Sequence, residues 1–531
     1  MKSLFTNLFP ILLFIPFGFS QSLPNQTKAN DALTLDSLPV IYIPGIMGSP
    51  MYDDLNNDDI LEDFEKAWIG LQYFSMRLDE NGIDPLYSQY NIKVAPIRND
   101  TANTLRDELE EEPLDLFKGF FDNMEANGYI LDDNDNDFSE GENLFCFTYD
   151  WRKDNTYNAA LLSEFIDSVI SWTGKDKVNL VAHSMGGIVA KTFIKLFDKS
   201  RIEKLVFIGT PHLGAPEVLT VMLTGKLFEW LNNIFTNYFI RELGRNLPSC
   251  YQLIPTLSYF DLNLNNGISS DVEVYSECFQ LLDGSYLTYN ELIEYLRNYE
   301  SPLGEDLNDA LLDSSEFFKE KIDTVDFGNV QVFNIVGANQ ETIGLNKEVE
   351  LVPGSGIIII QDERNLNGDY TVPLRSAELI NGQVFENTYY VSGMIHSAIP
   401  SAQSTLEILL GVFSDPPDTN FPLYSQPPES YRFITDIEGY TELSHSFYLS
   451  QNFPNPFNPV TKIDYRVPTL SQVKIKLYDI LGNEIATLVN EDKTIGEYRI
   501  TFYAGNLPSG TYFYQLQAGD FIETKKMILM K

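Results

Sequence analysis

The sequence contains few cysteines, and their small number limits what can hold the fold together. Its 531 residues include only Cys146, Cys250 and Cys278, so at most one disulfide bond can form and a disulfide framework is excluded. Cys146 lies in an apolar, strand-like run and is expected to be an inert core thiol, while Cys250 and Cys278 are a candidate pair. No histidine or cysteine cluster has the spacing of a metal site, and we expect no metal and no cofactor.

Basic residues are also scarce. The chain has 36 Lys and Arg against 76 Asp and Glu, a formal net charge of -40. Nucleic acid and anionic membranes repel a body this acidic, so we expect no nucleic-acid partner, and any peripheral contact with lipid would use apolar surface. The acidic stretches 52–64 and 131–142 carry oxygen atoms that suit calcium, but they lack the EF-hand spacing, and solvated loops are the favoured interpretation.

The first apolar run, from Leu8 to Phe19, is too short for a permanent membrane span. Lys2 precedes it, and small residues occur at Gly18 and Ser20. This is the pattern of a secretory signal peptide over residues 1–20, and the two prolines inside the run disfavour a buried helix. We therefore predict an exported protein.

A serine stands at the apex of a tight turn between two apolar segments. Residues 178–190 run from an apolar stretch through Ser184 and two glycines into an apolar helix start, which is the form of a nucleophile elbow with Ala182 in place of the first glycine. Small residues on either side of the serine prevent collisions of β-carbons. Amides of the following helix face the place where negative charge develops. The alternative is a buried strand that meets a helix with an incidental serine.

The segments around Ser184 alternate between strand and helix patterns. Short connections between such segments predict a parallel sheet with right-handed crossovers. The strand-like runs are 143–148, 178–181 and 205–208, and the helical patterns are 161–170 and 188–197.

These patterns predict an α/β fold, an α/β-hydrolase over residues 38–411 with a mostly parallel sheet and an inserted cap at about 215–325. The apolar residues of the cap would suit an acyl chain, although core packing explains them equally well. The sheet is expected to resume at 330–336 and 349–360.

Only four histidines are available as the base of a serine hydrolase. His183 is the neighbour of Ser184 and cannot fold back on its hydroxyl, and His212 comes too early to leave room for an acid strand before it. His445 lies beyond a proline-rich segment. His396, in a loop after a strand, is therefore the predicted base.

The acid should precede the base in the order Ser, Asp or Glu, His. Asp369 lies in a glycine-flanked turn at the right place, although a simple Gly-Asp turn looks the same. The backbone N–H groups of Ile46, in a Pro/Gly turn after a short strand, and of Met185 are the predicted oxyanion hole. His396 would take the Ser184 proton, an acyl-enzyme would form, and water or another alcohol would take the acyl group.

The C-terminal part changes in composition. Residues 412–445 are rich in proline and are expected to form an extended linker. From 446 to 531, apolar and polar residues alternate between turn signals, which predicts a small antiparallel β-sandwich. A carbohydrate-binding sandwich is the alternative, but no exposed aromatic platform is evident.

Several motifs occur in a fixed order along the first part of the chain. They are Pro44-Gly45-Ile46-Met47-Gly48-Ser49, Trp68, Tyr149-Asp150-Trp151-Arg152, Ala182-His183-Ser184-Met185-Gly186-Gly187, Thr210-Pro211-His212-Leu213-Gly214-Ala215, Pro248-Ser249-Cys250-Tyr251-Gln252-Leu253-Ile254-Pro255, Gly368-Asp369-Tyr370-Thr371-Val372-Pro373 and His396. Together these motifs resemble the lecithin–cholesterol acyltransferase family, which includes phospholipid:diacylglycerol acyltransferases and lysosomal phospholipase A2. The resemblance spans roughly residues 38–410 in the family's order.

This resemblance implies Ser184, Asp369 and His396 as the catalytic triad and an acyl ester of a glycerolipid or a related alcohol as the donor. Two departures occur. Tyr370 stands where the family usually has glycine, and the chain lacks the cysteines of the early lid disulfide found in the animal enzymes. We assign Tyr149-Asp150-Trp151-Arg152 structural support and no chemical role.

The tail contains several short motifs and a lysine-rich end. They are Asn452-Phe453-Pro454-Asn455-Pro456-Phe457-Asn458-Pro459, Tyr478-Asp479-Ile480-Leu481-Gly482, Pro508-Ser509-Gly510-Thr511-Tyr512, Lys525, Lys526 and Lys531. With these residues the tail resembles the type A sorting domain of type IX secretion. This resemblance implies a Gram-negative host of the Bacteroidetes or a related lineage, type IX secretion machinery as a partner, and export through the periplasm to the surface or the medium.

The leading hypothesis is a secreted, serine-dependent acyl-ester enzyme that acts on lipids, either an O-acyltransferase or a lipase or phospholipase. Both use the same acyl-enzyme and differ in the acceptor. The alternative from another class is a catalytically inactive surface adhesin or binding protein on a hydrolase scaffold.

Overall fold

The computed structural model divides the chain into two compact units, Met1–Phe433 and Ile434–Lys531, which we describe separately. Residues 1–20, Trp68 and His445 lie outside the described residues, as do most of the acidic stretches. The structure describes residues 38–529 except for 50, 55–63, 67–76, 84–91, 95–117, 133–140, 227–233, 262–276, 301–305, 351–357, 415, 422–423, 429, 431–447, 450–451, 453–456, 458, 468–470, 479–483, 494–495, 506 and 519–520.

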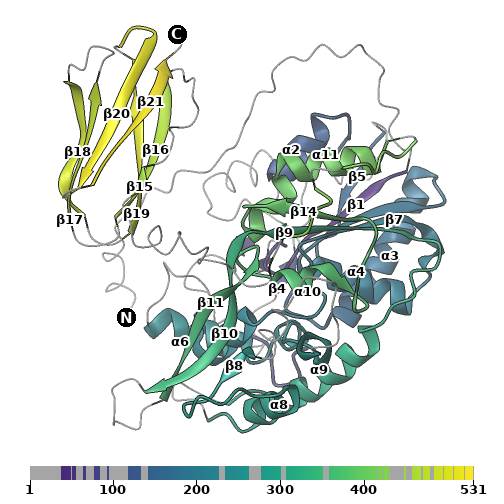
Figure 1. The fold of residues 1–531 in the computed structure, drawn as a ribbon. Helices are drawn as coiled ribbons and strands as arrows, with labels where there is room; N and C mark the ends of the chain where they lie inside the picture. Colours follow the sequence, from purple (N-terminus) through teal and green to yellow (C-terminus); the bar gives the residue numbers. More distant parts are fainter. Residues whose placement is uncertain are drawn as a thin grey trace. The chain divides into compact units, whose positions relative to one another are not determined.

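A six-stranded, fully parallel sheet in the order β14-β9-β7-β6-β1-β5 forms the centre of the first unit (Figure 1). The predicted α/β fold with a mostly parallel sheet is confirmed. The strands are β1 (Val40–Ile43), β5 (Leu144–Cys146), β6 (Val178–His183), β7 (Ile202–Ile208), β9 (Gln331–Ala338) and β14 (Thr388–Ser392).

Helices cover both faces of this sheet, because side chains of each strand point alternately to two hydrophobic clusters. In β1, Ile41 and Ile43 belong to one cluster and Val40 and Tyr42 to the other. The first cluster includes α3 (Asn155–Thr173) and α4 (Met185–Leu196), and the second includes α2 (Lys118–Glu125) and α11 (Gln403–Val412).

The helix after Ser184 begins at Met185, three residues before the predicted start at Ile188. Glycine is a poor helix former, so the pattern of Gly186 and Gly187 indicated a turn. Both glycines are needed for close packing. A β-carbon on Gly186 would lie 2.4 Å from the carbonyl oxygens of Ile43 and Pro44, and one on Gly187 would lie 1.9 Å from Thr210 Oγ1.

The predicted continuation of the main sheet at 349–360 is wrong. Val349 lies in β10 (Gln340–Glu350) and Ile360 lies in β11 (Ile358–Gly368). These two antiparallel strands belong to a separate sheet in the order β11-β10-β8, with β8 (Phe279–Gln280). The residue types of Pro353-Gly354-Ser355-Gly356 in the sequence favour a turn and argue against one continuous strand over 349–360.

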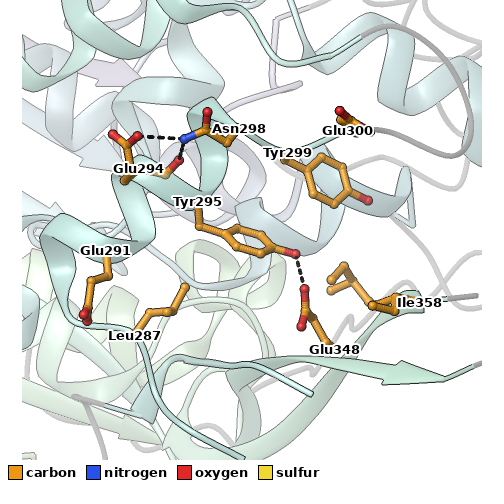
Figure 2. A pocket seen from close by; sticks show the side chains of 10 residues that line it. Leu287, Glu291, Glu294, Tyr295, Asn298, Tyr299, Glu300, Glu348 and Ile358 are labelled. Atoms are coloured by element: carbon orange, nitrogen blue, oxygen red, sulfur yellow. Dashed lines mark hydrogen bonds between the residues drawn. The ribbon is translucent and has the colours of Figure 1, made fainter. Parts of the chain in front are cut away.

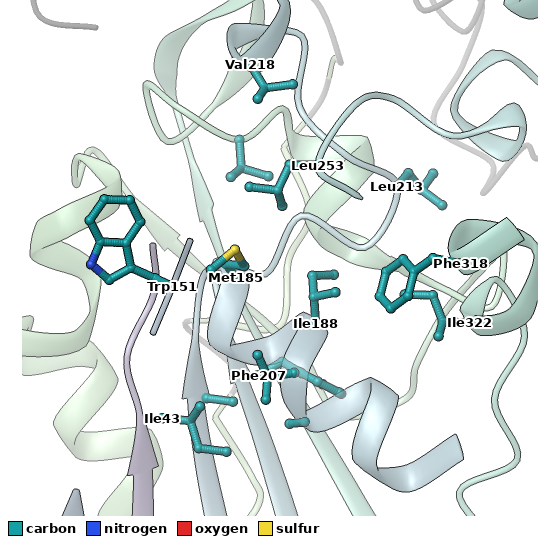
Figure 3. Packing of buried hydrophobic residues seen from close by; sticks show 14 of the residues in the cluster. Ile43, Trp151, Met185, Ile188, Phe207, Leu213, Val218, Leu253, Phe318 and Ile322 are labelled. Carbon is teal, nitrogen blue, oxygen red and sulfur yellow. The ribbon is translucent and has the colours of Figure 1, made fainter. Parts of the chain in front are cut away.

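Helices dominate the predicted cap region, and their apolar side chains join the cluster around α4. Figure 3 shows Val218 and Leu253 among the residues of the cluster that also contains Met185, the first residue of α4. Core packing accounts for the members of this cluster, while residues 227–233 of the predicted cap lie outside the described residues. The helices are α5 (Glu217–Thr224), α6 (Ile234–Gly244), α7 (Pro248–Gln252), α8 (Tyr289–Arg297) and α9 (Asp309–Ile322).

Several short elements complete this unit. They are β2 (Met51–Asp54), β3 (Phe64–Lys66) and β4 (Ile92–Val94) in one sheet, β12 (Leu379–Ile380) and β13 (Gln383–Val384) in another, α10 (Leu374–Glu378), and the 3₁₀ turns η2 (Lys199–Arg201), η4 (Leu257–Phe260) and η6 (His396–Ser401). Among the described residues, no helix is both long and apolar enough to cross a bilayer.

The predicted linker differs from the structure in its first part. The N–H of Tyr390 donates to the carbonyl of Tyr424 at 2.6 Å, and the Asn367 side chain donates to the carbonyl of Ser430 at 3.0 Å. Proline disfavours helix but leaves carbonyl groups free to accept hydrogen bonds, so this stretch packs on the first unit. The first compact unit extends to Phe433 and so includes the first part of the predicted linker 412–445.

The second unit consists of two antiparallel sheets with a shared core, in the orders β15-β16-β19 and β18-β17-β20-β21. Ile463 of one sheet and Ile475 of the other belong to the same cluster, as the predicted β-sandwich requires. The strands are β15 (Tyr448–Leu449), β16 (Val460–Val467), β17 (Ser471–Tyr478), β18 (Glu484–Lys493), β19 (Gly496–Tyr503), β20 (Gly510–Ala518) and β21 (Phe521–Leu529).

All three cysteines are free thiols, so the candidate pair Cys250 and Cys278 is not bridged. Cys250 and Cys278 are buried among apolar side chains, and burial raises the pKa of the Cys250 thiol to about 12. Burial also raises the pKa of Cys146, which agrees with an unreactive core thiol.

Candidate active site

Ser184 lies at the carboxyl end of β6 with a strained backbone. Its φ of 55° and ψ of -129° are rare for an L-residue, and they turn the chain sharply from strand into helix α4. Its N–H donates to the carbonyl of Ile208 at 2.9 Å, and its carbonyl accepts from Gly187 at 2.9 Å. These two bonds hold the serine at the apex of the turn.

The structure brings Ser184, His396 and Asp369 together from three separate loops. Ser184 Oγ lies 2.8 Å from His396 Nε2, and His396 Nδ1 lies 2.8 Å from Asp369 Oδ2. The carboxylate accepts from Nδ1–H, which leaves Nε2 of the neutral ring to accept from the serine hydroxyl. This is the geometry of a nucleophile, a base and an orienting acid.

Asp369 is fully buried, and backbone groups fix its orientation. Its Oδ1 accepts from the N–H of Thr371 at 3.1 Å and from the N–H of Val372 at 2.7 Å. Its backbone carbonyl accepts from the N–H of His396 at 2.7 Å. The acid and the base are therefore joined both through their side chains and through their backbones.

The charges around His396 favour its protonated form. Burial lowers its pKa, but attraction to Asp369, the hydrogen bond to Asp369 and the charge of Glu217 together raise the pKa above its usual value. A histidine in this environment is suited to accept a proton, because the imidazolium form is stabilised.

The region of the predicted oxyanion hole lies directly against Ser184. A β-carbon on Gly45 would be 2.7 Å from Ser184 Cβ and 3.1 Å from Ser184 Oγ, so only glycine fits here. Ile46 follows this glycine, and Met185 begins helix α4. The two predicted amides thus belong to the residues next to Gly45 and next to Ser184.

Tyr149 holds the loop that contains Gly45. Its hydroxyl donates to the carbonyl of Pro44 at 2.8 Å, and its N–H donates to Ser49 Oγ at 3.0 Å. Sequence reasoning assigned this motif structural support without identifying its target. The tyrosine in Tyr149-Asp150-Trp151-Arg152 was the sequence feature that could have indicated a hydrogen bond to a nearby loop.

His183 and His212 are both buried and both occupy positions other than that of the base. His183 Nε2 donates to the backbone carbonyl of His396 at 3.2 Å. His212 lies edge-on to Phe207, with ring centroids 4.8 Å apart. Burial keeps the pKa of each imidazole well below its ordinary value, so both rings are neutral.

A separate cavity of about 540 Å³ lies against α8, β10 and β11 (Figure 2). Four glutamates and two tyrosines are among its lining residues, and the hydroxyl of Tyr295 donates to Glu348 at 2.9 Å. Neither Ser184, Asp369 nor His396 lines it. This cavity is therefore separate from the group formed by Ser184, His396 and Asp369.

The chain resembles known proteins in two regions. Residues 97–329 match the family model described as lecithin:cholesterol acyltransferase. This part of the chain is therefore similar to the lecithin:cholesterol acyltransferase family. The matched region contains Ser184 and ends before Asp369 and His396, so the placing of the acid and the base rests on the geometry above.

Two relatives from Arabidopsis thaliana are similar to part of this chain. The chain is 27% identical over 277 residues to "Lecithin-cholesterol acyltransferase-like 4", which covers 45% of this chain and 50% of the relative. It is 26% identical over 275 residues to "Phospholipase A(1) LCAT3", which covers 45% and 59%. The chain thus spans about half the length of the curated relatives it matches.

Two solved structures resemble this chain at low sequence identity. The mature Bacillus licheniformis lipase BlEst2 has 15% identity and a TM-score of 0.29 over 52% of this chain and 82% of the lipase. A chain of the Tle4-Tli4 complex has 16% identity and a TM-score of 0.42 over 70% and 97%. Similarities this weak carry no argument about activity.

The tail matches the model of the secretion system C-terminal sorting domain over residues 451–530. The resemblance seen in the sequence is thereby confirmed. A domain of this kind indicates secretion or export to the cell surface in bacteria of the Bacteroidetes type.

Proposed function

We propose that the first unit is a serine-dependent acyl-ester enzyme that acts on lipids, as an O-acyltransferase or as a lipase or phospholipase. One observation carries the proposal, the chain of 2.8 Å contacts from Ser184 Oγ through His396 to Asp369. The family match and the names of the two plant relatives support a lipid acyl ester as substrate.

In the proposed mechanism, Ser184 Oγ attacks the ester carbonyl while His396 Nε2 takes its proton. The N–H groups of Ile46 and Met185 stabilise the resulting oxyanion, and loss of one such donor typically costs about 100- to 1000-fold in rate. When the intermediate collapses, His396 returns the proton to the leaving alcohol and the acyl group stays on Ser184.

The second half of the reaction repeats these roles with a new acceptor. Water or a lipid alcohol gives its proton to His396 Nε2 and attacks the acyl-enzyme, and the proton then returns to Ser184. Asp369 holds the imidazole in the required tautomer throughout. The choice of acceptor decides between hydrolysis and acyl transfer.

We also propose that type IX secretion machinery handles the chain through residues 446–531 and delivers the enzyme outside the cell. The sorting-domain match supports this route.

An acyl-donor assay with phospholipid vesicles, with and without a long-chain alcohol, tests the proposal. We expect fatty-acid release without the alcohol or a new ester with it, and loss of at least about 1000-fold in Ser184→Ala. A fluorophosphonate probe should label the unchanged chain and not this variant. Full activity in Ser184→Ala would refute the triad, and failure of the unchanged chain to react with the probe would favour the inactive binding protein.

A further inference from the structure

The residue after the acid has an unusual backbone conformation. Tyr370 has a φ of 83°, in the left-handed region that a bulky L-residue rarely adopts. Its N–H donates to Thr342 Oγ1 at 2.9 Å. A conformation of this kind persists only when the surrounding contacts impose it.

Arg364, on β11, contacts Tyr370 at two points. Its Nη1 donates to the Tyr370 carbonyl at 2.6 Å, and its guanidinium carbon lies 3.7 Å from the centre of the tyrosine ring. Its Nη2 also lies 4.0 Å from Glu217 Oε1 on α5. The guanidinium thus contacts both the backbone and the ring of the strained residue, and its other side faces a carboxylate.

We propose that Arg364 is a positioning residue that holds the strained Tyr370 backbone and thereby keeps Asp369 aimed at His396. The proposal deepens the proposed function and rests on it, because it assigns a support to the acid of that triad.

The geometry makes this support specific. Asp369 Oδ1 accepts from the N–H groups of Thr371 and Val372, so these bonds depend on how the chain turns at Tyr370. If φ of Tyr370 relaxed to a negative value, both N–H groups would move away from the carboxylate. The cation over the ring and the bond to the carbonyl favour the strained form over the relaxed one.

Glycine at position 370 would remove the need for Arg364. A glycine adopts a positive φ without steric cost, so the turn would keep its shape without the contacts of Arg364. Arg364 should therefore be needed when residue 370 is tyrosine and not when it is glycine. This difference separates positioning from a general electrostatic effect of the guanidinium, which would be the same with either residue.

The test compares Arg364→Ala, Tyr370→Gly and the double variant in the full chain. With tyrosine, Arg364→Ala should lower kcat about 10- to 100-fold with little change in KM, as expected for a small displacement of a catalytic group. With glycine, the same substitution should lower kcat by no more than about threefold. Arg364→Lys, which keeps the charge and loses the planar fork, should fall between the two.

The matched control is Arg201→Ala. Arg201 also lies over an aromatic ring, that of Phe193, and pairs with Asp167, and neither of these residues belongs to the Asp369 turn. This substitution should leave kcat within about twofold. A thermal melt of each variant separates a loss of folded protein from a loss of rate.

A second readout does not depend on turnover. Because the chain has only four histidines, the signal of the His396 ring can be followed by NMR in histidine-labelled protein. Asp369, Glu217 and His183 are the charged and titratable groups that act on this ring. Arg364→Ala should lower the pKa of His396 with tyrosine at position 370, because the contact with Asp369 loosens, and should lower it less with glycine.

Equal effects of Arg364→Ala on kcat and on the His396 titration in both backgrounds would overturn the proposal. So would an unchanged His396 titration in Arg364→Ala. If the unchanged protein turned over no ester, the proposed function would fail while the NMR comparison would still decide whether Arg364 holds the turn.

Discussion

His183, the residue before the nucleophile, donates a hydrogen bond from Nε2 to the backbone carbonyl of His396 at 3.2 Å. The two imidazole rings lie 4.8 Å apart, and the bond joins the nucleophile turn to the loop of the base, 213 residues away in sequence. A carbonyl oxygen only accepts, so Nε2 of His183 carries the proton. Burial keeps the pKa of His183 low and its ring neutral.

This bond predicts different results for two substitutions at position 183. Glutamine can place a side-chain N–H near the position of Nε2, whereas leucine fills the space without a donor and leaves the His396 carbonyl unsatisfied. We expect His183→Leu to lower kcat about 10-fold or more and His183→Gln to retain most of the rate. Steady-state kinetics on one soluble ester checks this, and equal losses in both variants would contradict it.

The Asp369–His396 contact predicts a large effect of Asp369→Asn. The amide cannot accept from Nδ1–H in the way the carboxylate does, so the imidazole loses the tautomer that accepts from Ser184. By comparison with other serine hydrolases, kcat should fall about 10,000-fold. In the same variant the acid limb of the pH profile of kcat/KM should move to lower pH, because Asp369 raises the pKa of His396.

A matched control for this substitution is Asp326→Asn. Asp326 is a surface acid whose carboxylate pairs with Lys199, and its side chain is 87% exposed. Its loss should change neither the rate nor the pH profile. A fall of less than about tenfold in Asp369→Asn would mean that another carboxylate orients the base.

Three residues of this site could be predicted from the sequence, either from a local pattern or by excluding the other candidates. Ser184 follows from an apolar strand, small neighbours and an apolar helix. His396 follows because the other three histidines are excluded by position. Asp369 follows from chain order and a glycine-flanked turn.

The remaining support could not be predicted, because it depends on contacts between distant segments. Tyr149 reaches the Pro44 carbonyl across 105 residues and His183 reaches His396 across 213. No spacing in the sequence encodes such contacts. The left-handed backbone of Tyr370 is also invisible in the sequence, because tyrosine is a residue type that argues against a positive φ.

In the fold, too, local features could be predicted from the sequence and long-range pairings could not. Strands β5, β6 and β7 and their crossover helices repeat a pattern that short segments reveal. Strands β10 and β11 form a separate antiparallel sheet, and periodicity does not tell which sheet an apolar strand joins.

The contact between Gly45 and Ser184 predicts that Gly45→Ala impairs catalysis without unfolding the chain. The added β-carbon would meet Ser184 Cβ at 2.7 Å, so the loop that carries Ile46 must move away from the nucleophile. We expect kcat to fall about 100- to 1000-fold, the cost of losing one oxyanion donor. Kinetics and a thermal melt measure the two effects separately.

Gly244→Ala serves as the control for this prediction. A β-carbon on Gly244 meets no atom within 4 Å, and the residue ends helix α6. Kinetic constants should stay unchanged in this variant. If Gly45→Ala kept its full rate, Ile46 would have no part in binding the oxyanion.

The buried carboxyl of Glu217 should make the free energy of unfolding depend on pH. Burial raises the pKa of its carboxyl from the usual 4.5 to about 7, although Arg364 and a hydrogen bond from Thr371 oppose the shift. Because the pKa in the folded state exceeds that in the unfolded state, the contribution of Glu217 to stability is full below pH 4.5 and is lost as the pH rises through 7. Glu217→Gln, which stays neutral, should lose less stability than the unchanged chain between these values.

Urea unfolding of the two proteins at several pH values between 4.5 and 8 measures this difference directly. The side chain is 19% exposed, so solvent weakens the effect without removing it. Glu291→Gln is the matched control, since hydrogen bonds from Thr288 lower the pKa of this exposed carboxyl. It should leave the stability profile unchanged in this range. Parallel profiles for Glu217→Gln and the unchanged chain would show that Glu217 is already ionised well below neutral pH in the folded protein.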